Sequence, residues 1–269
     1  MTCSKSREPA VAGTFYPSDP QNLRTQVRGF IESARPRRPA LRPKAIIAPH
    51  AGYLYSGAIA GSAYQSLLDC ARSIERVVLL GPSHHVAFSG LALSHYTTFR
   101  TPLGDVLLDT AAINRIQPLP QVQYLEAAHA REHCLEVHLP FLQIALTHFS
   151  IVPLVVGSIA PEYVAEVLKL LWDENTLIVV SSDLSHYLDY TSAGTVDART
   201  CSKIEQLDYA HIYPEEACGA HAIAGLLKEA SNRHLSATTL DLRNSGDTAG
   251  SKDRVVGYGA WSFHSAACQ

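Results

Sequence analysis

The chain has 269 residues, 46% of them hydrophobic, which is enough apolar material for one large buried core or two small ones. Its formal net charge is −3, from 22 basic and 25 acidic residues, and it has no long basic run, so we expect no nucleic-acid partner. The first residues lack the apolar region of a signal peptide, and no later stretch approaches the roughly 20 apolar residues of a membrane helix. We therefore expect a soluble, cytoplasmic protein without a membrane partner.

Two stretches have the pattern of amphipathic helices. The first begins after Asp19, where an N-cap residue and a first-turn proline precede an apolar stripe of Leu23, Val27 and Ile31. The second stretch has the i, i+3, i+4, i+7 spacing of a buried helix face, which comprises Val164, Val167, Leu168 and Leu171. Both patterns predict a helix that packs one face against a core.

Five short runs rich in β-branched residues predict strands, at residues 44–48, 76–80, 150–156, 176–180 and 255–258. Their nearly continuous hydrophobicity indicates cover on both faces. Strands that alternate with helices predict a three-layer αβα architecture, and no repeat or linker divides the chain, so we expect a single domain over residues 1–269. Pro153 would break the hydrogen-bond ladder of a central strand, so the third strand is expected at an edge or with a bulge.

The cysteines are scattered, with no C-x-x-C pair and no zinc-finger spacing, at Cys3, Cys70, Cys134, Cys201, Cys218 and Cys268. This pattern predicts free thiols in a reducing compartment. The 13 histidines are more informative, because several of them fall in short polar clusters directly after the apolar runs.

Polar residues follow three of the predicted strands, at residues 48–53, 81–85 and 181–186. In an α/β sheet, ligands bind beyond the carboxyl ends of the strands. If these strands are parallel neighbours, one edge of the sheet gathers the side chains of His50, of His84 or His85, and of Asp183 and His186. Imidazoles brought together in this way predict a metal site, although any one of them could instead cap a backbone carbonyl. The sequence does not choose between His84 and His85, whose side chains point in opposite directions in an extended chain.

A fourth cluster lies at residues 132–140 and contains Glu132, His133, Glu136 and His138. It lacks the H-E-x-x-H spacing of zinc metalloproteases, because its two histidines are five residues apart and no glutamate follows the first. Two interpretations remain open. The cluster either lines a functional site or forms a solvated, salt-bridging helix face.

A fifth cluster lies at residues 213–221, where Pro214 and two following glutamates predict the start of a helix. Cys218 would then lie near the first turn, where the helix dipole lowers the pKa of a thiol and favours the thiolate. His221, three residues later, would share its face. The alternative is a small, buried, inert cysteine.

Taken together, these five clusters resemble the motifs of the Memo family, known in bacteria and archaea as AmmeMemoRadiSam system protein B. Residues 7–16 and 257–260 also resemble landmarks of this family, so the similarity spans nearly the whole chain. The resemblance implies a fold similar to that of class III extradiol dioxygenases of the LigB type.

The same resemblance implies that His50, His84 and Cys218 are metal ligands. It implies catalytic roles for Asp183 and for His186, which takes the place of the acid/base histidine of the dioxygenases. Residues that match other positions around the site are His85, Tyr53, Glu132, His133, His138 and His221. The dioxygenases have a carboxylate where this family has a thiolate, so copper and zinc become candidates beside Fe(II), which we expect first.

Three functional hypotheses follow. The first is a mononuclear non-haem Fe(II) or copper oxidoreductase of dioxygenase type that acts on a small molecule. The second is a non-catalytic metal- or peptide-binding protein that acts with radical-SAM and AMMECR1-like partners, which the bacterial family name implies. The third is metal-free nucleophilic catalysis by Cys218.

Overall fold

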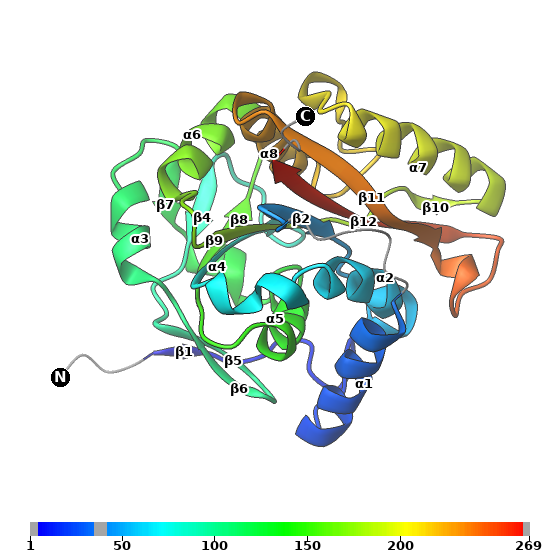
Figure 1. Ribbon diagram of the computed structural model, residues 1–269, viewed down its shortest axis with the longest axis horizontal. Coiled ribbons are helices and arrows are strands. Elements are labelled where there is room, and N and C mark those ends of the chain that lie inside the picture. The colour runs from blue at the N-terminus through cyan, green and yellow to red at the C-terminus, as the bar shows by residue number, and fades with distance from the viewer. Residues whose placement is uncertain (1–4, 35–41, 266–269) are drawn as a thin grey trace.

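The computed structural model describes residues 5–34 and 42–265, and it places one large sheet between two layers of helices (Figure 1). Within the described residues this sheet has nine strands, in the order β10-β12-β2-β9-β3-β8-β4-β7, with β11 paired to β12. The strands are β2 (Ala45–Ala48), β3 (Arg76–Pro82), β4 (Leu91–Leu93), β7 (Val122–Tyr124), β8 (Ser150–Val156), β9 (Thr176–Ser181), β10 (His186–Leu188), β11 (Leu235–Asn244) and β12 (Val255–Ser265). All five predicted strands are therefore confirmed.

Strands β2, β9, β3 and β8 are parallel and form the centre of the sheet. Every residue of β2 and β9 is buried, as expected for strands covered on both faces. Strand β12 runs antiparallel to β2, and β4 runs antiparallel to β8. A smaller sheet has the order β1-β5-β6, with strands Ser6–Arg7, Thr98–Thr101 and Gly104–Leu107.

Pro153 does not lie in an edge strand, because β8 is paired on both sides. On its outer side, the Ile151 carbonyl accepts a hydrogen bond from the amide of Asp109, and Val155 pairs with Ala92 of β4. Residues two apart in a strand direct their backbone groups to the same side. The nitrogen of Pro153 therefore points to the outer side of β8, between the positions where Asp109 and Ala92 pair with it. The missing N–H therefore removes no bond from the central ladder.

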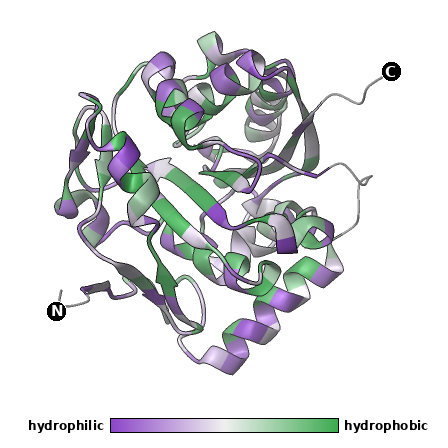
Figure 2. Cartoon of the chain, turned by 60° about the vertical axis from the view of Figure 1, so that its left-hand side comes forward, coloured by the Kyte–Doolittle hydropathy of each residue, from purple (hydrophilic) through white to green (hydrophobic). Residues whose placement is uncertain are grey.

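Helices cover both faces of the sheet. One layer contains α1 (Pro20–Ser33), α2 (Tyr53–Gln65) and α5 (Leu139–Ala145), and the other contains α3 (Thr110–Ile116), α6 (Pro161–Leu171), α7 (Tyr190–Glu205) and α8 (Ala220–Asn232). Figure 2 shows hydrophobic strands in the interior and hydrophilic residues on the outer faces of the helices. This is the predicted three-layer αβα arrangement.

Shorter helical segments connect these layers. They are α4 (Glu126–Ala130) and the 3-10 turns at Leu68–Ser73, Glu136–His138, Tyr209–His211 and Ser245–Asp247. In the part of the chain that the structure describes, no helix has both the length and the apolarity needed to cross a membrane.

Both amphipathic helices form as predicted. The Asp19 side chain caps α1 by accepting a hydrogen bond from the Asn22 amide at 2.8 Å. The predicted apolar stripes are buried, with Leu23, Val27 and Ile31 in α1 and Val164, Val167, Leu168 and Leu171 in α6. An N-cap with apolar periodicity was therefore sufficient to place α1, and periodicity alone was sufficient to place α6.

The helix predicted to start at Pro214 is wrong, because α8 begins only at Ala220. The preceding residues form turns that tertiary contacts hold. The Cys218 amide donates to the Asp183 carbonyl at 3.2 Å, and Lys203 binds the Glu216 carboxylate at 2.7 Å. These bonds to other elements replace the first helical turn.

Two helical glycines allow a matched test of the packing between α6 and α8. A Cβ at Gly225 would collide with the Val164 side chain, whereas a Cβ at Gly194 in α7 would meet nothing within 4 Å. Gly194→Ala should stabilise the protein by about 0.5–1 kcal/mol, because alanine is the better helix former. Gly225→Ala should destabilise it, because overpacking costs about 1–3 kcal/mol. Chemical denaturation measures the change in the free energy of unfolding for each variant. An equal increase in both variants would contradict the close contact between Gly225 and Val164.

Candidate metal centre

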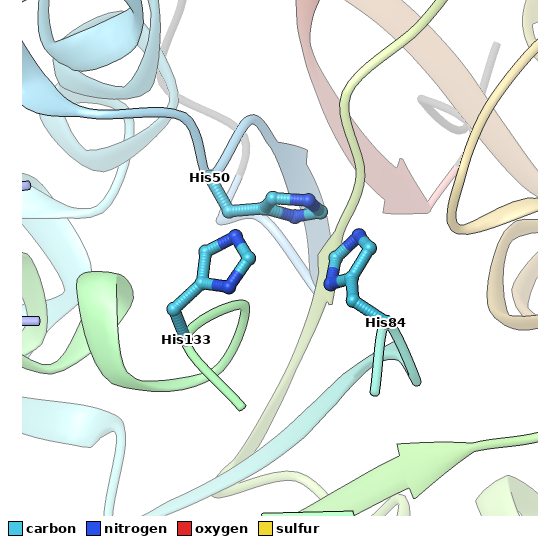
Figure 3. A group of neighbouring side chains, drawn as sticks. All are labelled: His50, His84 and His133. Carbon is cyan, nitrogen blue, oxygen red and sulfur yellow. The ribbon is translucent and has the colours of Figure 1, made fainter. Parts of the chain in front are cut away.

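Three loops meet at the carboxyl ends of the central strands. Strand β9 lies between β2 and β3, and all three are parallel, so the residues that follow them share one edge of the sheet. Figure 3 shows His50, from the loop after β2, His84, from the loop after β3, and His133, from the segment before α5, with their rings facing one another. The predicted convergence of strand ends is therefore confirmed for His50 and His84.

His50 is held in one tautomer. Its Nδ1 lies 2.6 Å from the Ser181 hydroxyl, which itself donates to the Cys134 carbonyl at 2.7 Å. Because the hydroxyl has only one proton to give, it must accept from Nδ1–H of His50. Burial lowers the pKa of His50 well below its usual value, so the ring is neutral. Its Nε2 therefore carries a lone pair, the form that a metal ion requires.

His84 is anchored through both its backbone and its ring. Its amide lies 2.7 Å from Glu132 Oε2, and its Nδ1 lies 2.8 Å from Glu132 Oε1. Nδ1–H is therefore the donor, and Nε2 is left free. Burial alone would lower the pKa of His84, but the hydrogen bond and charge of Glu132 outweigh it, so the pKa is raised. His85 is exposed, with its ring 6.4 Å from that of His133.

Glu132 accepts hydrogen bonds that hold several neighbouring residues of the centre in place. Besides binding His84, its Oε1 accepts hydrogen bonds from the amides of His133 at 2.9 Å and Cys134 at 3.1 Å. Although burial opposes ionisation, the His84 and amide hydrogen bonds lower the pKa of Glu132 to about 2. Glu132 is only 2% exposed and Glu136 is fully buried, so the interpretation of this cluster as a solvated helix face is wrong.

Three imidazoles come together. One ring nitrogen each of His50, His84 and His133 lies within 4.8 Å of the other two. The ring centroids are 5.1 Å apart for His50 and His84, 4.9 Å for His84 and His133, and 5.5 Å for His50 and His133. Neutral imidazole suits zinc, copper and iron, so the donor set fits a transition metal.

His84, Glu132 and Cys134 form a second group of possible metal ligands. Hydrogen bonds within the protein explain why these side chains lie together. The Cys134 thiol donates to the Pro82 carbonyl at 3.1 Å, and burial raises its pKa well above the usual value. The Glu132 carboxylate already accepts four hydrogen bonds. These atoms are satisfied without an ion, so this group supports the centre and does not hold a metal itself.

Cys218 lies next to His50. Its sulfur is 3.4 Å from His50 Nε2 and accepts a hydrogen bond from the Asp183 amide at 3.3 Å. Burial and the charge of Asp183 raise the pKa of the Cys218 thiol to about 12. The predicted lowering by a helix dipole is therefore wrong, since α8 starts after this residue. A raised thiol pKa also argues against metal-free nucleophilic catalysis.

The two residues with expected catalytic roles, Asp183 and His186, differ in their exposure to solvent. Asp183 is buried, and its Oδ1 accepts a hydrogen bond from the His50 amide at 2.8 Å. Burial raises the pKa of Asp183 to about 7. His186 is exposed in β10, with its ring 5.8 Å from that of Tyr187. Tyr187 has a φ of 60°, which is rare for a bulky residue.

The other residues predicted to line the site form hydrogen bonds with groups other than the rings of His50, His84 and His133. The Tyr53 hydroxyl donates to the Val137 carbonyl at 2.6 Å. His138 is buried, and its Nδ1 lies 2.9 Å from the Tyr64 hydroxyl. His221 Nδ1 lies 2.9 Å from the Ile159 carbonyl. Tyr53 and His138 lie in the packed core, while His221 binds the turn before α6.

Sequence reasoning missed two supporting residues. Ser181 belongs to a recognised cluster, but nothing in that cluster indicates that its hydroxyl fixes the tautomer of His50. Arg7 donates to Glu136 Oε2 at 2.8 Å and to the carbonyls of His129 and Glu132 at 2.8 and 2.5 Å. Arg7 thus fixes the segment that carries Glu132, and only its place in a family landmark could have suggested it.

The four cysteines in the described part of the chain have free thiols, at Cys70, Cys134, Cys201 and Cys218. Cys3 and Cys268 lie outside the described residues.

Ser181→Ala tests how much the anchoring of His50 matters. It removes the acceptor of Nδ1–H, so the ring loses its fixed tautomer and metal affinity should fall about tenfold, as for other residues that orient metal ligands. The unpaired N–H should also cost about 1–3 kcal/mol of stability. Calorimetric metal titration measures the first effect. Ser66→Ala, which removes a hydroxyl that donates to the Ala63 carbonyl, is the control. Equal affinities in the two variants would contradict this role of Ser181.

Comparisons with known proteins identify the family of the chain. A family model described as "Memo-like protein" matches residues 7–262. A MEMO1 family protein of Aquifex aeolicus (strain VF5) is 37% identical over 270 residues, which cover 94% of this chain and 97% of that protein. A MEMO1 family protein of Metallosphaera sedula is 33% identical over 280 residues, covering 96% and 99%.

A crystal structure of the uncharacterized protein JW3007 from Escherichia coli K12 is more distant. It is 13% identical, with a TM-score of 0.48, and the match covers 81% of this chain and 99% of that one. The family assignment rests instead on the family model and on the two relatives, which extend over nearly the whole chain. The chain belongs to the Memo family.

Proposed function

We propose that the protein binds one transition-metal ion at His50, His84 and Cys218 and uses it to oxidise a small organic substrate. The observation that carries the metal proposal is the fixed orientation of two imidazoles. Ser181 and Glu132 hold the Nδ1 atoms of His50 and His84, which would leave both Nε2 atoms to bind a metal at the same edge of the sheet. Ligand histidines in metalloproteins commonly have such partners on their other nitrogen.

Fe(II) is the metal that we propose first, with copper and zinc as alternatives that the same nitrogen and sulfur donors would accept. When bound, a redox-active ion would supply a centre that polarises a substrate oxygen and reacts with dioxygen. Asp183, whose pKa is raised to about 7, would exchange a proton near neutral pH beside His50. His186, exposed at the rim, would take a proton from a substrate hydroxyl.

Oxygen consumption tests the oxidation proposal. Protein purified anaerobically and loaded with Fe(II) should consume oxygen when catechols or related phenols are added, with a loss of about 10²–10⁴-fold in kcat for His186→Asn if that residue transfers the proton. His211→Asn, an exposed histidine paired with Asp208, is the matched control. Absence of metal-dependent oxygen uptake with every phenol and heterocycle tried would count against the oxidase.

A second candidate function is binding of a peptide without turnover. It is supported by exposed apolar side chains next to the site residues in sequence. Leu54 is 67% exposed, Tyr55 39% and Tyr187 64%, and exposed apolar residues often mark interaction surfaces. In this case radical-SAM and AMMECR1-like proteins are the partners that we would test first, in a cytoplasmic setting. Metal binding without substrate-dependent change at the metal would favour this candidate.

A further inference from the structure

His133 has the geometry of a metal ligand, although neither its sequence cluster nor the family resemblance marks it as one. Its ligand nitrogen lies within 4.8 Å of those of both His50 and His84. Cys218 belongs to no such group of three among the described residues, although its sulfur is 3.4 Å from His50 Nε2. The donor that completes the His50 and His84 pair most compactly is therefore another imidazole.

The surroundings of His133 leave one of its nitrogens free. Its Nδ1 lies 3.4 Å from Glu132 Oε1, the same oxygen that binds Nδ1 of His84. Burial lowers the pKa of His133 to about 4, so the ring is neutral at physiological pH. A proton on Nδ1, next to the carboxylate, leaves the lone pair on Nε2. The Glu132 carboxylate thus lies beside Nδ1 of both imidazoles, with a hydrogen bond to His84 and a longer charge contact to His133.

Packing also limits the freedom of the ring. The Phe15 ring lies 4.7 Å from it, and the His84 ring stacks on it at 4.9 Å with an angle of 20°. The backbone amide of His133 is fixed by Glu132 Oε1 at 2.9 Å. The side chain is therefore positioned before a metal binds, which reduces the entropy that binding would cost.

We propose that His133 is a further direct metal ligand, so that three imidazoles, from His50, His84 and His133, bind the ion together with Cys218. This inference rests on the proposed metal-binding function and adds a nitrogen donor to its ligand set. Three imidazole nitrogens accept zinc and Cu(II) as well as Fe(II).

Copper spectroscopy on the full chain tests this proposal without any assay of activity. Wild-type protein loaded with a single equivalent of Cu(II) should show pulsed-EPR modulation from three imidazoles. His133→Phe, which keeps an aromatic ring against Phe15, should show two imidazoles and bind Cu(II) at least tenfold more weakly in calorimetric titrations. His211→Asn is the control, because His211 is an exposed histidine paired with Asp208. It should keep the wild-type spectrum and affinity.

The outcomes separate this inference from the proposed function. Wild-type protein that binds Cu(II) through only two imidazoles, or His133→Phe with wild-type affinity, overturns the role of His133 and leaves metal binding intact. Wild-type protein that binds no metal overturns the proposed function as a whole. The imidazole count of the wild type needs no variant, so the test survives even if His133→Phe fails to fold. Thermal unfolding of the metal-free variant shows whether it folds.

Discussion

Replacing Arg7 with alanine is expected to lower the free energy of unfolding by about 3–5 kcal/mol, the usual cost of removing one partner from a buried ion pair. The Arg7 and Glu136 side chains are 3% and 0% exposed, and their charged atoms lie 2.8 Å apart. The variant leaves the Glu136 carboxylate with only the Tyr16 hydroxyl and the amides of Ala10 and Val11 as donors. The backbone carbonyls of His129 and Glu132 also lose the hydrogen bonds that Arg7 donates to them.

Urea denaturation of Arg7→Ala and Arg100→Ala would measure this difference. Arg100 also pairs with a glutamate, Glu8, but both side chains are largely exposed, so its loss should change stability little. If the two variants were equally stable, the buried pair would not hold the N-terminal segment to the segment that carries Glu132. Arg7→Ala should also weaken metal binding, because it loosens the support of Glu132.

Glu132→Gln is expected to weaken metal binding about 10–100-fold, the range seen when a residue that orients a metal ligand is changed. Both carboxylate oxygens accept hydrogen bonds, three on Oε1 and the His84 amide on Oε2. In the variant, an NH2 group replaces one of these oxygens. This group donates hydrogen bonds, and so do the N–H groups that it would face, so the hydrogen bonds to that oxygen are lost. His84 then loses either its ring anchor or its backbone anchor, and its Nε2 is no longer fixed.

Calorimetric titration with Zn(II) would measure the affinity of this variant. Glu126→Gln is the matched control, since Glu126 accepts hydrogen bonds from the Ser94 hydroxyl and the His95 amide. Unchanged affinity in Glu132→Gln would show that His84 does not depend on this carboxylate, or that it does not bind the metal.

The layout of the centre was largely predictable from local patterns. Runs of β-branched residues predict the parallel strands, and polar residues at their ends predict where His50 and His84 lie, because parallel neighbours end at the same edge. Sequence could not choose between His84 and His85. The structure supplies the reason for the choice, because Glu132 binds both the amide and the ring of His84.

The errors came from contacts between residues distant in the chain. Pro214 and two glutamates have the composition of a helix start, but the Cys218 amide binds the Asp183 carbonyl instead, so α8 begins at Ala220. A solvated helix face, one of the two interpretations left open for residues 132–140, is excluded because Arg7, 129 residues before Glu136, pairs with the buried Glu136 carboxylate. No local pattern contains that information.

The central claim is that His50 and His84 hold a metal ion, and elemental analysis of anaerobically purified protein tests it most directly. We predict close to one transition-metal ion per wild-type chain after dialysis. In the double variant His50→Ala and His84→Ala we predict almost none, with the fold checked by circular dichroism. Wild-type protein free of metal after incubation with Fe(II), Cu(II) and Zn(II), or equal metal retention in the folded double variant, would contradict the account.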